Sequence, residues 1–461
     1  MAHIAPEIFK AYDIRGIVGT TLTDDAAALI GRALAAEARA LGVDTVALGR
    51  DGRLSGARLA QILAAEFVAA GVNVCDLGMV ATPMLYFAAH TRCGGSGVMI
   101  TGSHNPPQYN GFKIMLAGET LSGERIQDLL RRIMRDDFAE KNLSGSLQNL
   151  DIEADYIQYI TDHIRLQRPL TIAIDAGNGV AGAFAGKLYT ALGCTVHELF
   201  CEVDGTFPNH HPDPAKPENL QDLIRCLQTG DAEIGLAFDG DGDRLGVVTK
   251  DGEIIYPDRQ LMLFAADVLA RNVGAKVIYD VKCTRLLRDW ISDHGGEPIL
   301  SKTGHSFIKA AMKTHGAALA GEMSGHVFFG ERWFGFDDGM YAGARLLEIV
   351  AAHADANAPL KALPNALSTP EINIPMQKEG ENHALIAKLQ QEARFPEARD
   401  IITLDGLRVE YADGFGLIRA SNTTPVLVLR FEADNAAALA RIRADFVAVL
   451  QAAGVAADFA A

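Results

Sequence analysis

Short apolar runs that alternate with amphipathic helical spacing recur along most of the chain. In the first segment, residues 45–48 have the pattern of a strand, apolar residues at helical spacing follow over 59–67, and a second apolar run covers 98–100. The same order returns twice more, with apolar runs at 171–174, 234–238, 276–279 and 317–320. Strands that alternate with helices favour βα units and a largely parallel sheet. Ligands of such sheets bind beyond the carboxyl ends of the strands, so we expect each segment to offer loops to one shared cleft.

The last part of the chain has a different pattern. Residues 372–374, 406–411 and 426–431 alternate with a period of two, and a helix is predicted over 435–452. This combination is typical of a small α+β domain. The predicted fold class is therefore α/β, with three similar α/β domains of mixed, mainly parallel sheets plus a C-terminal α+β domain around a central cleft. The predicted domains are 1–148, 149–253, 254–366 and 367–461.

Composition narrows the class of partner and the compartment. The 461 residues include 42 Lys and Arg against 58 Asp and Glu, a net charge of −16. An acidic surface argues against nucleic acid or an anionic membrane as the main partner. No apolar stretch reaches the ~18 residues of a membrane span, and the N-terminus has no signal-peptide pattern. The six cysteines form no C-x-x-C pair, so we expect buried free thiols in a cytoplasmic protein.

Three carboxylates alternate with glycine in the run Asp239-Gly240-Asp241-Gly242-Asp243, directly after an apolar run. Glycine lets the backbone turn tightly, so the three side chains can converge, and clustered oxygen ligands suit Mg²⁺ or Ca²⁺. An EF-hand would need glycine at its sixth position and glutamate at its twelfth, where this chain has Arg244 and Lys250. The run therefore predicts a divalent-metal loop of another kind.

Ser103 lies in a second polar loop, Thr101-Gly102-Ser103-His104-Asn105-Pro106-Pro107, just past a predicted strand. A serine in this position is suited to act as a nucleophile or a phosphate carrier, and the two prolines stiffen the loop around it. A Ser-His-Asp hydrolase is one alternative, although the G-x-S-x-G pattern is absent because Asn stands at position 105. A plain turn residue is the other alternative, and the loop alone leaves both open.

Three further loops carry candidate chemistry. Gly177, Gly179 and Gly182 have the spacing of a dinucleotide-binding turn, with Glu198 and Glu202 about 20 residues on, but a lone match of this kind is weak. The run 321–326 offers a carboxylate and a hydroxyl to sugar hydroxyls. The run 419–424 combines a guanidinium with several hydroxyls, which suits a phosphate.

Taken together and in this order, the loops resemble those of the α-D-phosphohexomutase superfamily, and within it the bacterial phosphomannomutase/phosphoglucomutase group. The four matching loops read TGSHNPP, DGDGDR, GEMSGH and RASNTTP, and the resemblance extends over almost the whole chain. It implies a monomer of four domains, three of them similar α/β domains, in agreement with the repeat pattern. It also implies that a phosphoserine at Ser103 is present in the resting enzyme.

The resemblance assigns roles to particular residues. The metal site would bind Mg²⁺ through Ser103, Asp239, Asp241 and Asp243. Glu322 and Ser324 would bind the 3- and 4-hydroxyls of the sugar. The other sugar-binding positions are His326, Lys282 and Tyr12. The clamp on the non-reacting phosphate would be Arg419, Ser421, Asn422 and Thr423. The remaining catalytic positions are Lys113, Arg15, His104, Arg244 and His305, and Lys113 is favoured over His305 as general base.

The implied reaction is a reversible phosphoryl transfer between the 1- and 6-positions of glucose and mannose phosphates. It would pass through a hexose 1,6-bisphosphate, with glucose 1,6-bisphosphate as activator. Phosphoglucosamine is the lesser choice of substrate because Met323 stands where those mutases usually have Gln, and because their serine loop lacks the Pro106-Pro107 pair. A phosphosugar phosphatase and a non-catalytic phosphosugar-binding protein are the alternatives from other classes. Dual specificity for glucose and mannose is expected, since contacts to the 3- and 4-hydroxyls do not distinguish sugars that differ at C2.

Overall fold

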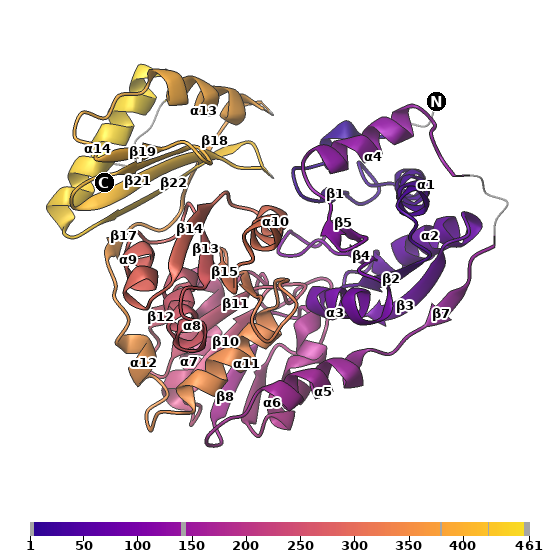
Figure 1. Ribbon diagram of the computed structural model, residues 1–461, viewed down its shortest axis with the longest axis horizontal. Helices are drawn as coiled ribbons and strands as arrows, with labels where there is room; N and C mark the ends of the chain where they lie inside the picture. The colour runs from indigo at the N-terminus through magenta and orange to yellow at the C-terminus, as the bar shows by residue number, and fades with distance from the viewer. Residues whose placement is uncertain (1–3, 140–143, 379, 423, 456–461) are drawn as a thin grey trace.

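The computed structural model describes residues 4–139, 144–378, 380–422 and 424–455, and these form four sheets with flanking helices (Figure 1). The first three sheets mix parallel and antiparallel pairs, with the antiparallel pairs toward one edge, and the fourth is antiparallel throughout. The predicted fold class, three α/β units followed by an α+β unit, is confirmed. The exact domain boundaries stay a prediction.

The first sheet and its helices occupy the N-terminal third of the chain. Its strand order is β1 (Ile14–Ile17), β5 (Tyr109–Leu116), β4 (Gly97–Ile100), β2 (Thr45–Arg50), β3 (Asn73–Met79) and β7 (Leu147–Asn149), with β6 (Glu119–Thr120) beside β5. The helices are η1 (Pro6–Ile8), α1 (Asp24–Ala40), α2 (Gly56–Ala69), α3 (Thr82–Arg92) and α4 (Glu124–Met134). α1 begins where the Thr23 hydroxyl accepts the backbone N–H of Ala26, and two aspartates in its first turn complement the helix dipole.

The second and third sheets follow the same plan. The second sheet is β12 (Ile254–Ile255), β11 (Leu245–Thr249), β10 (Ile234–Phe238), β8 (Thr171–Asp175) and β9 (Thr195–Leu199). The third is β14 (Glu297–Ser301), β13 (Lys276–Asp280), β15 (Leu319–Gly321) and β16 (Val327–Phe329). Their helices are α5 (Glu153–His163), η2 (Val180–Ala183), α6 (Ala185–Ala191), η3 (Pro217–Leu220), α7 (Gln221–Thr229), α8 (Pro257–Arg271), α9 (Leu286–Asp293), α10 (His305–His315), α11 (Gly339–Val350) and α12 (Ala358–Lys361).

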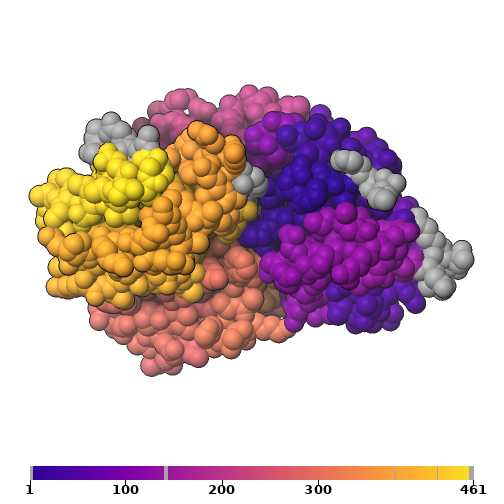
Figure 2. All heavy atoms as spheres, turned by 90° about the horizontal axis from the view of Figure 1, so that it is seen from above, coloured from indigo at the N-terminus to yellow at the C-terminus, as the bar shows by residue number. Residues whose placement is uncertain are grey.

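The fourth sheet packs against two helices at the end of the chain. Its order is β17 (Leu367–Ser368), β22 (Val426–Ala433), β21 (Gly414–Ala420), β20 (Leu407–Glu410) and β19 (Asp400–Ile402), with β18 (Ile372–Pro375) also beside β22. The helices are α13 (Glu381–Glu392) and α14 (Ala436–Ala452), which begins after the N-cap residue Asn435. Figure 2 shows this C-terminal unit (orange to yellow) and the N-terminal unit (indigo to purple) on opposite sides of the molecule.

The three predicted functional loops lie at equivalent places in the first three sheets. The loop 101–108 joins β4 to β5, the loop 239–244 joins β10 to β11, and the loop 322–326 joins β15 to β16. In each case the first strand is parallel to a neighbour and the second is antiparallel to the first. The three loops therefore leave the carboxyl ends of equivalent strands, which is the position that the repeat pattern predicted.

One large cluster of buried apolar residues reaches into all three α/β units, which also have smaller clusters of their own, and the fourth unit has a separate core. One cluster of buried residues runs from Ala47 to Leu363, whereas the fourth unit has its own cluster around Phe446. Alternate residues of β2 face different partners, because Val46 and Leu48 pack with α1 and α2 while Ala47 packs on the side of α3. A small apolar contact of Val281 with the fourth sheet joins the two parts.

The helices and the cysteines bear on two predictions about the chain as a whole. No described helix is both long and apolar enough to cross a membrane. All six cysteines are free, as predicted. The prediction that they are buried is right for Cys93, Cys194 and Cys283 and wrong for the other three, which are partly exposed. The partly exposed thiols lie on β3 and α7 and after β9, where the pattern of apolar neighbours did not separate the core face from the outer face.

Asp338 is a buried carboxyl group that links α11 to α5. It accepts the backbone N–H of Tyr341 at 2.9 Å as the N-cap of α11, and the hydroxyl of Tyr156 at 2.8 Å. Burial raises the pKa of Asp338 from its ordinary 3.8 to about 7. Between these values the unfolded chain is ionised while the folded chain keeps the proton, so the free energy of unfolding falls as the pH rises. The slope is at most about 1.4 kcal/mol per pH unit.

We expect the variant Asp338→Asn to remove this pH dependence, because an amide can still accept both hydrogen bonds but does not ionise. The melting temperature of the variant relative to the wild type should rise as the pH is raised from about 5 to about 8. The exposed carboxylate of Asp151, which accepts the backbone N–H of Glu153, provides the control variant Asp151→Asn. A difference between Asp338→Asn and the wild type that does not change with pH would contradict the prediction.

Candidate active site

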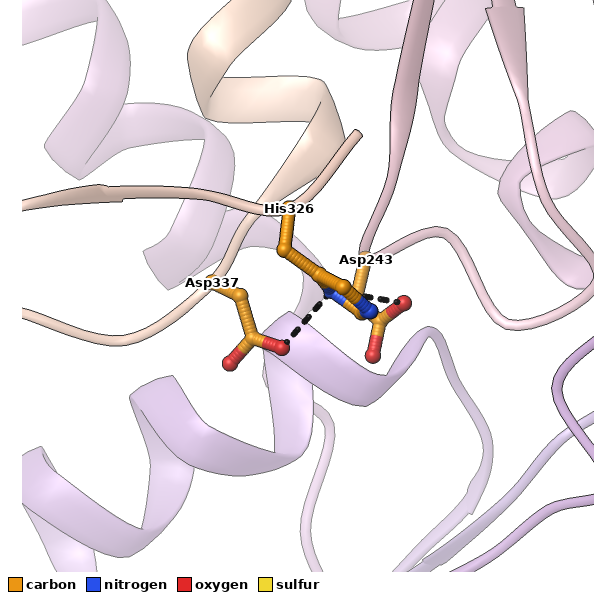
Figure 3. Close-up of side chains that lie close together, drawn as sticks. All are labelled: Asp243, His326 and Asp337. Carbon is orange, nitrogen blue, oxygen red and sulfur yellow. Dashed lines mark ion pairs between the residues drawn. The ribbon is translucent and has the colours of Figure 1, made fainter. Parts of the chain in front are cut away.

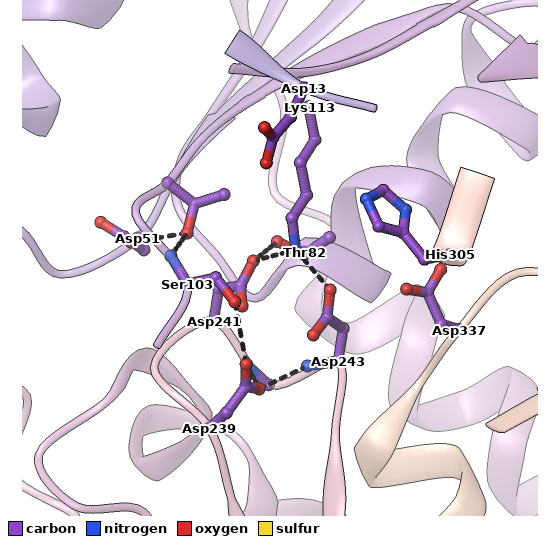
Figure 4. Close-up of polar contacts among 12 residues, drawn as sticks. Asp13, Asp51, Thr82, Ser103, Lys113, Asp239, Asp241, Asp243, His305 and Asp337 are labelled. Atoms are coloured by element: carbon purple, nitrogen blue, oxygen red, sulfur yellow. Dashed lines mark hydrogen bonds and ion pairs between the residues drawn. The ribbon is translucent and has the colours of Figure 1, made fainter. Parts of the chain in front are cut away.

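The serine loop (residues 101–108) and the aspartate loop (residues 239–244) meet in the interior of the molecule. The Ser103 hydroxyl is 2% exposed and donates a hydrogen bond to Asp239 Oδ2 at 3.0 Å (Figure 4). From α3, the Thr82 hydroxyl donates to Asp241 Oδ2 at 2.5 Å. The first and second sheets therefore bring together the two loops that the sequence singled out, although 136 residues separate Ser103 from Asp239 in the chain.

The loop 239–244 folds around one carboxylate oxygen. Asp239 Oδ1 accepts the backbone N–H groups of Gly242, Asp243 and Arg244 at 3.1, 3.1 and 3.2 Å. Gly242 has a φ of +78°, a conformation that glycine adopts without strain. The turn aims the carboxylates of Asp239, Asp241 and Asp243 at one point, where one oxygen of each lies within 4.8 Å of the others, and all three are fully buried.

The negative charge of this cluster is only partly neutralised by the described side chains. Lys113 on β5 donates to Asp241 Oδ2 at 2.7 Å and to Asp243 Oδ2 at 2.5 Å (Figure 4). Asp241 Oδ1 and Asp243 Oδ1 have no hydrogen-bond partner among the described residues. Burial and repulsion from Asp243 and Asp241 raise the pKa of Asp239 well above its ordinary value. Converging buried oxygens with unsatisfied lone pairs and surplus charge fit a hard divalent cation, so the cluster could hold a metal ion.

The backbone of the serine loop is held in an unusual conformation. Ser103 has a φ of +49°, in the left-handed region that is costly for residues other than glycine. The Nδ1 atom of His104 lies 3.2 Å from the Ser103 hydroxyl. Burial and the nearby Arg244 lower the pKa of His104 well below its ordinary value, so its imidazole is neutral. On the other side of the loop, Arg15 donates to Asn105 Oδ1 at 2.5 Å and pairs with Asp13.

His326 connects the loop 322–326, the predicted sugar loop, to the aspartate loop. Its Nδ1 atom lies 3.0 Å from Asp337 Oδ2 and 3.5 Å from Asp243 Oδ1 (Figure 3), and its Nε2 accepts from Arg244 Nε at 3.1 Å. Lys309 pairs with Asp337 at 3.0 Å. Although burial would raise it, Lys309 and His326 hold the pKa of Asp337 well below its ordinary value. The second and third units are thus joined at the site by a row of polar contacts that runs from Lys309 through Asp337 and His326 to Arg244.

Glu322 and Ser324 lie together at the start of the sugar loop. The backbone N–H of Gly304 donates to Glu322, and the Ser324 hydroxyl lies 3.4 Å from Glu322 Oε2. The ring of His305 meets the Tyr12 ring edge-on at 5.3 Å, so the N-terminal segment reaches the third sheet here. Burial and Lys309 lower the pKa of His305 well below its ordinary value.

The fourth sheet contributes its loop through Arg419, at the end of β21. Arg419 Nε donates to Asp405 Oδ2 at 3.0 Å, and the same oxygen accepts the backbone N–H of Thr303 from the third unit at 3.0 Å. Ser421 and Asn422 follow in the same loop, and Asn422 lines a cavity of about 210 Å³ between the third and fourth units. The predicted clamp residue Thr423 lies outside the described residues. Lys282, after β13, pairs with Glu371 at 3.1 Å.

The predicted residues that the structure describes therefore lie on neighbouring loops, strands and a helix end, and the structure adds residues that sequence reasoning missed. Thr82 and Lys309 lie on helices without a recognisable motif, and Asp337 lies in an ordinary-looking loop. Asp51 and Arg53 could have been found from the sequence, because they follow the first predicted strand in a Gly-Arg-Asp-Gly-Arg run. Both bind the serine loop, as described below.

The glycine-rich turn at 177–182 has a structural explanation. A side chain at Gly179 would approach the backbone carbonyl of Asp239 to 3.0 Å, and one at Gly182 would approach the carbonyl of Cys201 to 2.3 Å. These glycines let the turn pack against the chain's own backbone, including the aspartate loop. The spacing that resembles a dinucleotide-binding turn therefore serves close packing at this place.

Comparison with known proteins shows the same four units. Models of the phosphoglucomutase/phosphomannomutase family match residues 6–140, 154–252 and 256–367 as its α/β/α domains I, II and III, and residues 371–449 as its C-terminal domain. A phosphoglucomutase of Neisseria meningitidis serogroup A is 66% identical over 451 residues, covering 98% of both chains.

Two more relatives agree with this match. A phosphomannomutase/phosphoglucomutase of Pseudomonas aeruginosa is 58% identical over 440 residues, covering 95% of this chain and 94% of the other. The crystal structure of a phosphoglucomutase/phosphomannomutase family protein from Burkholderia thailandensis superposes with a TM-score of 0.93 at 57% identity and covers 99% of each chain. The chain belongs to the phosphoglucomutase/phosphomannomutase family of phosphohexomutases.

Proposed function

We propose that this enzyme transfers a phosphoryl group reversibly between the 1- and 6-positions of glucose and mannose phosphates, with Ser103 as the carrier. The observation that carries the proposal is the hydrogen bond of the Ser103 hydroxyl to a buried, incompletely neutralised carboxylate cluster. A phosphoryl group on Ser103 would lie beside that cluster, where a cation can draw off its charge. A turn serine with no chemical role would not need such surroundings.

The proposed reaction has two mirrored transfers. In the first, a free hydroxyl of the hexose phosphate attacks the phosphorus of phospho-Ser103, the bond from phosphorus to Oγ breaks, and a hexose 1,6-bisphosphate forms. The sugar hydroxyl loses a proton and Oγ gains one, so charge and atoms balance. The bisphosphate then turns around, and its other phosphoryl group returns to Oγ. Such transfers depend mainly on in-line positioning and on neutralising the charge of the phosphoryl oxygens.

The residues at the site supply these two requirements. Asp239, Asp241 and Asp243 are the proposed ligands of Mg²⁺, which when bound draws negative charge from the phosphoryl group. Arg15 and Arg244 flank the serine loop and add positive charge, and His104 contacts the hydroxyl itself. Burial of Ser103 limits access of water, which would otherwise compete with the sugar for the phosphoryl group.

Lys113 and His305 are the candidates for the proton acceptor. Burial would lower the pKa of Lys113, but Asp241 and Asp243 outweigh it and raise the pKa well above the ordinary value. These are two of the proposed metal ligands, so a bound cation would take up the charge that keeps Lys113 protonated. We therefore keep Lys113 as the proposed base. His305 is neutral in the described structure and is the second candidate.

Substrate recognition is proposed to divide between two loops. Glu322 and Ser324 lie where they can bind the 3- and 4-hydroxyls, with Lys282, His326 and Tyr12 around them. The clamp on the non-reacting phosphate is proposed to be Arg419, Ser421, Asn422 and Thr423. Contacts of this kind accept both orientations of the bisphosphate and do not distinguish glucose from mannose. Activation by glucose 1,6-bisphosphate, a monomeric state, and a cytoplasmic location without nucleic-acid or membrane partners stay predictions.

A coupled assay tests the function directly. With Mg²⁺ and trace glucose 1,6-bisphosphate, we expect glucose 1-phosphate and mannose 1-phosphate both to be converted to their 6-phosphates without release of inorganic phosphate. Release of phosphate without isomerisation would instead indicate a phosphatase. Turnover of glucosamine 1-phosphate alone would move the proposal to phosphoglucosamine, and inactivity on all three sugars would favour a binding role.

The carrier role predicts the behaviour of Ser103→Ala. Without Oγ the phosphoenzyme cannot form, so kcat should fall at least roughly a thousandfold, while titration calorimetry should still detect binding of glucose 1-phosphate. Ser96 is equally buried and its hydroxyl accepts the backbone N–H of Ala117, so Ser96→Ala is a matched control that should keep its turnover. Near-normal turnover by Ser103→Ala would refute the assigned role.

The metal site predicts a selective effect of Asp239→Asn. An amide oxygen can still accept the three backbone N–H groups that shape the loop, so the fold should survive while one ligand charge is lost. We expect Mg²⁺ to bind at least about tenfold more weakly by calorimetry and kcat to recover in part at high Mg²⁺. Asp175→Asn is the control, because Asp175 caps an equivalent turn of the same sheet, where it accepts the N–H of Gly177. Unchanged Mg²⁺ affinity of Asp239→Asn would exclude Asp239 as a ligand.

A further inference from the structure

One turn recurs in each of the three α/β units, after β2, β8 and β13. Asp51 directly follows β2, and Asp175 and Asp280 are the last residues of β8 and β13. Each aspartate accepts, through Oδ1, the backbone N–H of the residue two positions on, at 2.9, 2.9 and 3.2 Å. The residues at that position are Arg53, Gly177 and Lys282. Arg53 thus occupies the place in the first unit that the proposed sugar-binding lysine occupies in the third.

The Arg53 side chain is buried and binds the serine loop through its backbone. Its guanidinium group donates to four carbonyl oxygens of that loop, which are those of Ser103 at 2.8 Å, Asn105 at 2.6 Å, Pro106 at 2.7 Å and Tyr109 at 2.9 Å. Arg53 Nε also donates to Asp51 Oδ2 at 3.2 Å. A rigid, planar fork of five N–H donors can make such a set of bonds, and a lysine ammonium cannot reproduce its geometry.

Asp51 holds the other end of the same loop. Its Oδ2 accepts the hydroxyl of Thr101 at 2.7 Å and the backbone N–H of Gly102 at 3.2 Å. The Thr101 hydroxyl in turn accepts the backbone N–H of Ser103 at 2.8 Å. The peptide groups on both sides of the serine are therefore tied to one buried ion pair between Asp51 and Arg53.

Close packing makes the position of Ser103 depend on this ion pair. A side chain at Gly102 would come within 2.4 Å of Arg53 Cζ, and a side chain at Gly240 would come within 2.3 Å of the Ser103 carbonyl oxygen. That oxygen is thus enclosed between the guanidinium group and the aspartate loop. The left-handed backbone of Ser103 is unfavourable for a residue other than glycine, so it persists only because the surroundings hold it.

We infer that Arg53 is a positioning residue for the phosphoryl transfer, which fixes the backbone of Ser103 so that Oγ faces the carboxylate cluster. This inference rests on the proposed function. Within the described part of the chain, the hydrogen bonds of Arg53 go to Asp51 and to the carbonyl oxygens around the serine, and none goes to a proposed sugar-binding or phosphate-binding residue. Its removal should therefore lower kcat and leave KM nearly unchanged. A displacement of Oγ by about 1 Å is enough to slow a transfer on the order of a hundredfold.

The variants Arg53→Lys and Arg345→Lys test the inference as a pair. Arg345 on α11 is also fully buried and pairs with Asp267 at 3.0 Å and Glu331 at 2.9 Å, away from the serine loop. Both variants keep the charge and lose the fork. We expect Arg53→Lys to lower kcat, and the single-turnover transfer from phosphoenzyme to glucose 6-phosphate, on the order of a hundredfold, with KM within about threefold of the wild type. Arg345→Lys should lower the melting temperature without this loss of kcat.

A second variant guards against misfolding of Arg53→Lys. Gly102→Ala keeps Arg53 but pushes its guanidinium group away, so it should show the same fall in kcat at unchanged KM. Adding millimolar guanidinium ion to Arg53→Ala should restore part of the transfer rate, which a general loss of stability would not allow.

The outcomes separate the inference from the proposed function. If the wild-type enzyme is an active mutase and both Arg53→Lys and Gly102→Ala keep a kcat within about threefold of it, the inference alone is overturned. Equal losses of kcat in Arg53→Lys and Arg345→Lys would also overturn the inference alone. A wild-type enzyme without mutase turnover would overturn the proposed function and this inference with it.

Discussion

The site is organised by three buried carboxylates that repel one another. Asp239, Asp241 and Asp243 are forced together by a turn closed on Asp239 Oδ1, and burial denies them the screening of water. Lys113 is brought from the first sheet to lie between two of them, and Arg244 is turned back toward the third. The Ser103 hydroxyl donates to Asp239 of this cluster and the Thr82 hydroxyl to Asp241. Much of the contact between the first and second units at this point therefore exists to satisfy charge that one short loop creates.

One large apolar cluster joins the first three units, whereas the fourth is attached mainly through polar contacts. Arg430 binds Asp258 and the backbone of Lys282, and Arg408 donates to the carbonyls of Val281 and Cys283 at 2.7 Å. These arginines reach across from the fourth sheet to the turn that carries Lys282. The loop that presents the proposed clamp and the proposed sugar-binding lysine are thus held by neighbouring parts of one interface.

Strand and helix periodicity was enough to predict the fold, because each of the three α/β units buries its central β strands as nearly continuous apolar runs. β10 is buried at all five positions and appears in the sequence as such a run. The loops at the strand ends were also visible, since Ser103 and the aspartate triplet stand out in type and spacing. Thr82, Lys309 and Asp337 were not visible, because their importance comes from contacts across units that local spacing does not encode. The sequence analysis assigned Arg53 no role, and its importance is visible only from the carbonyl oxygens around it.

The repeated turn after β2, β8 and β13 separates two demands that compete in most sites. The aspartate alone shapes the backbone, since its Oδ1 bonds to a main-chain N–H that every residue except proline has. The side chain two positions later is therefore free of any duty to the turn. In the first unit this residue is the buried Arg53, and in the third unit it is Lys282, the proposed sugar-binding lysine. In the second unit it is Gly177, which has no side chain and against which His210 and Pro212 lie. One backbone turn therefore carries three different residues at the same position while its aspartate keeps the same bond to the main chain.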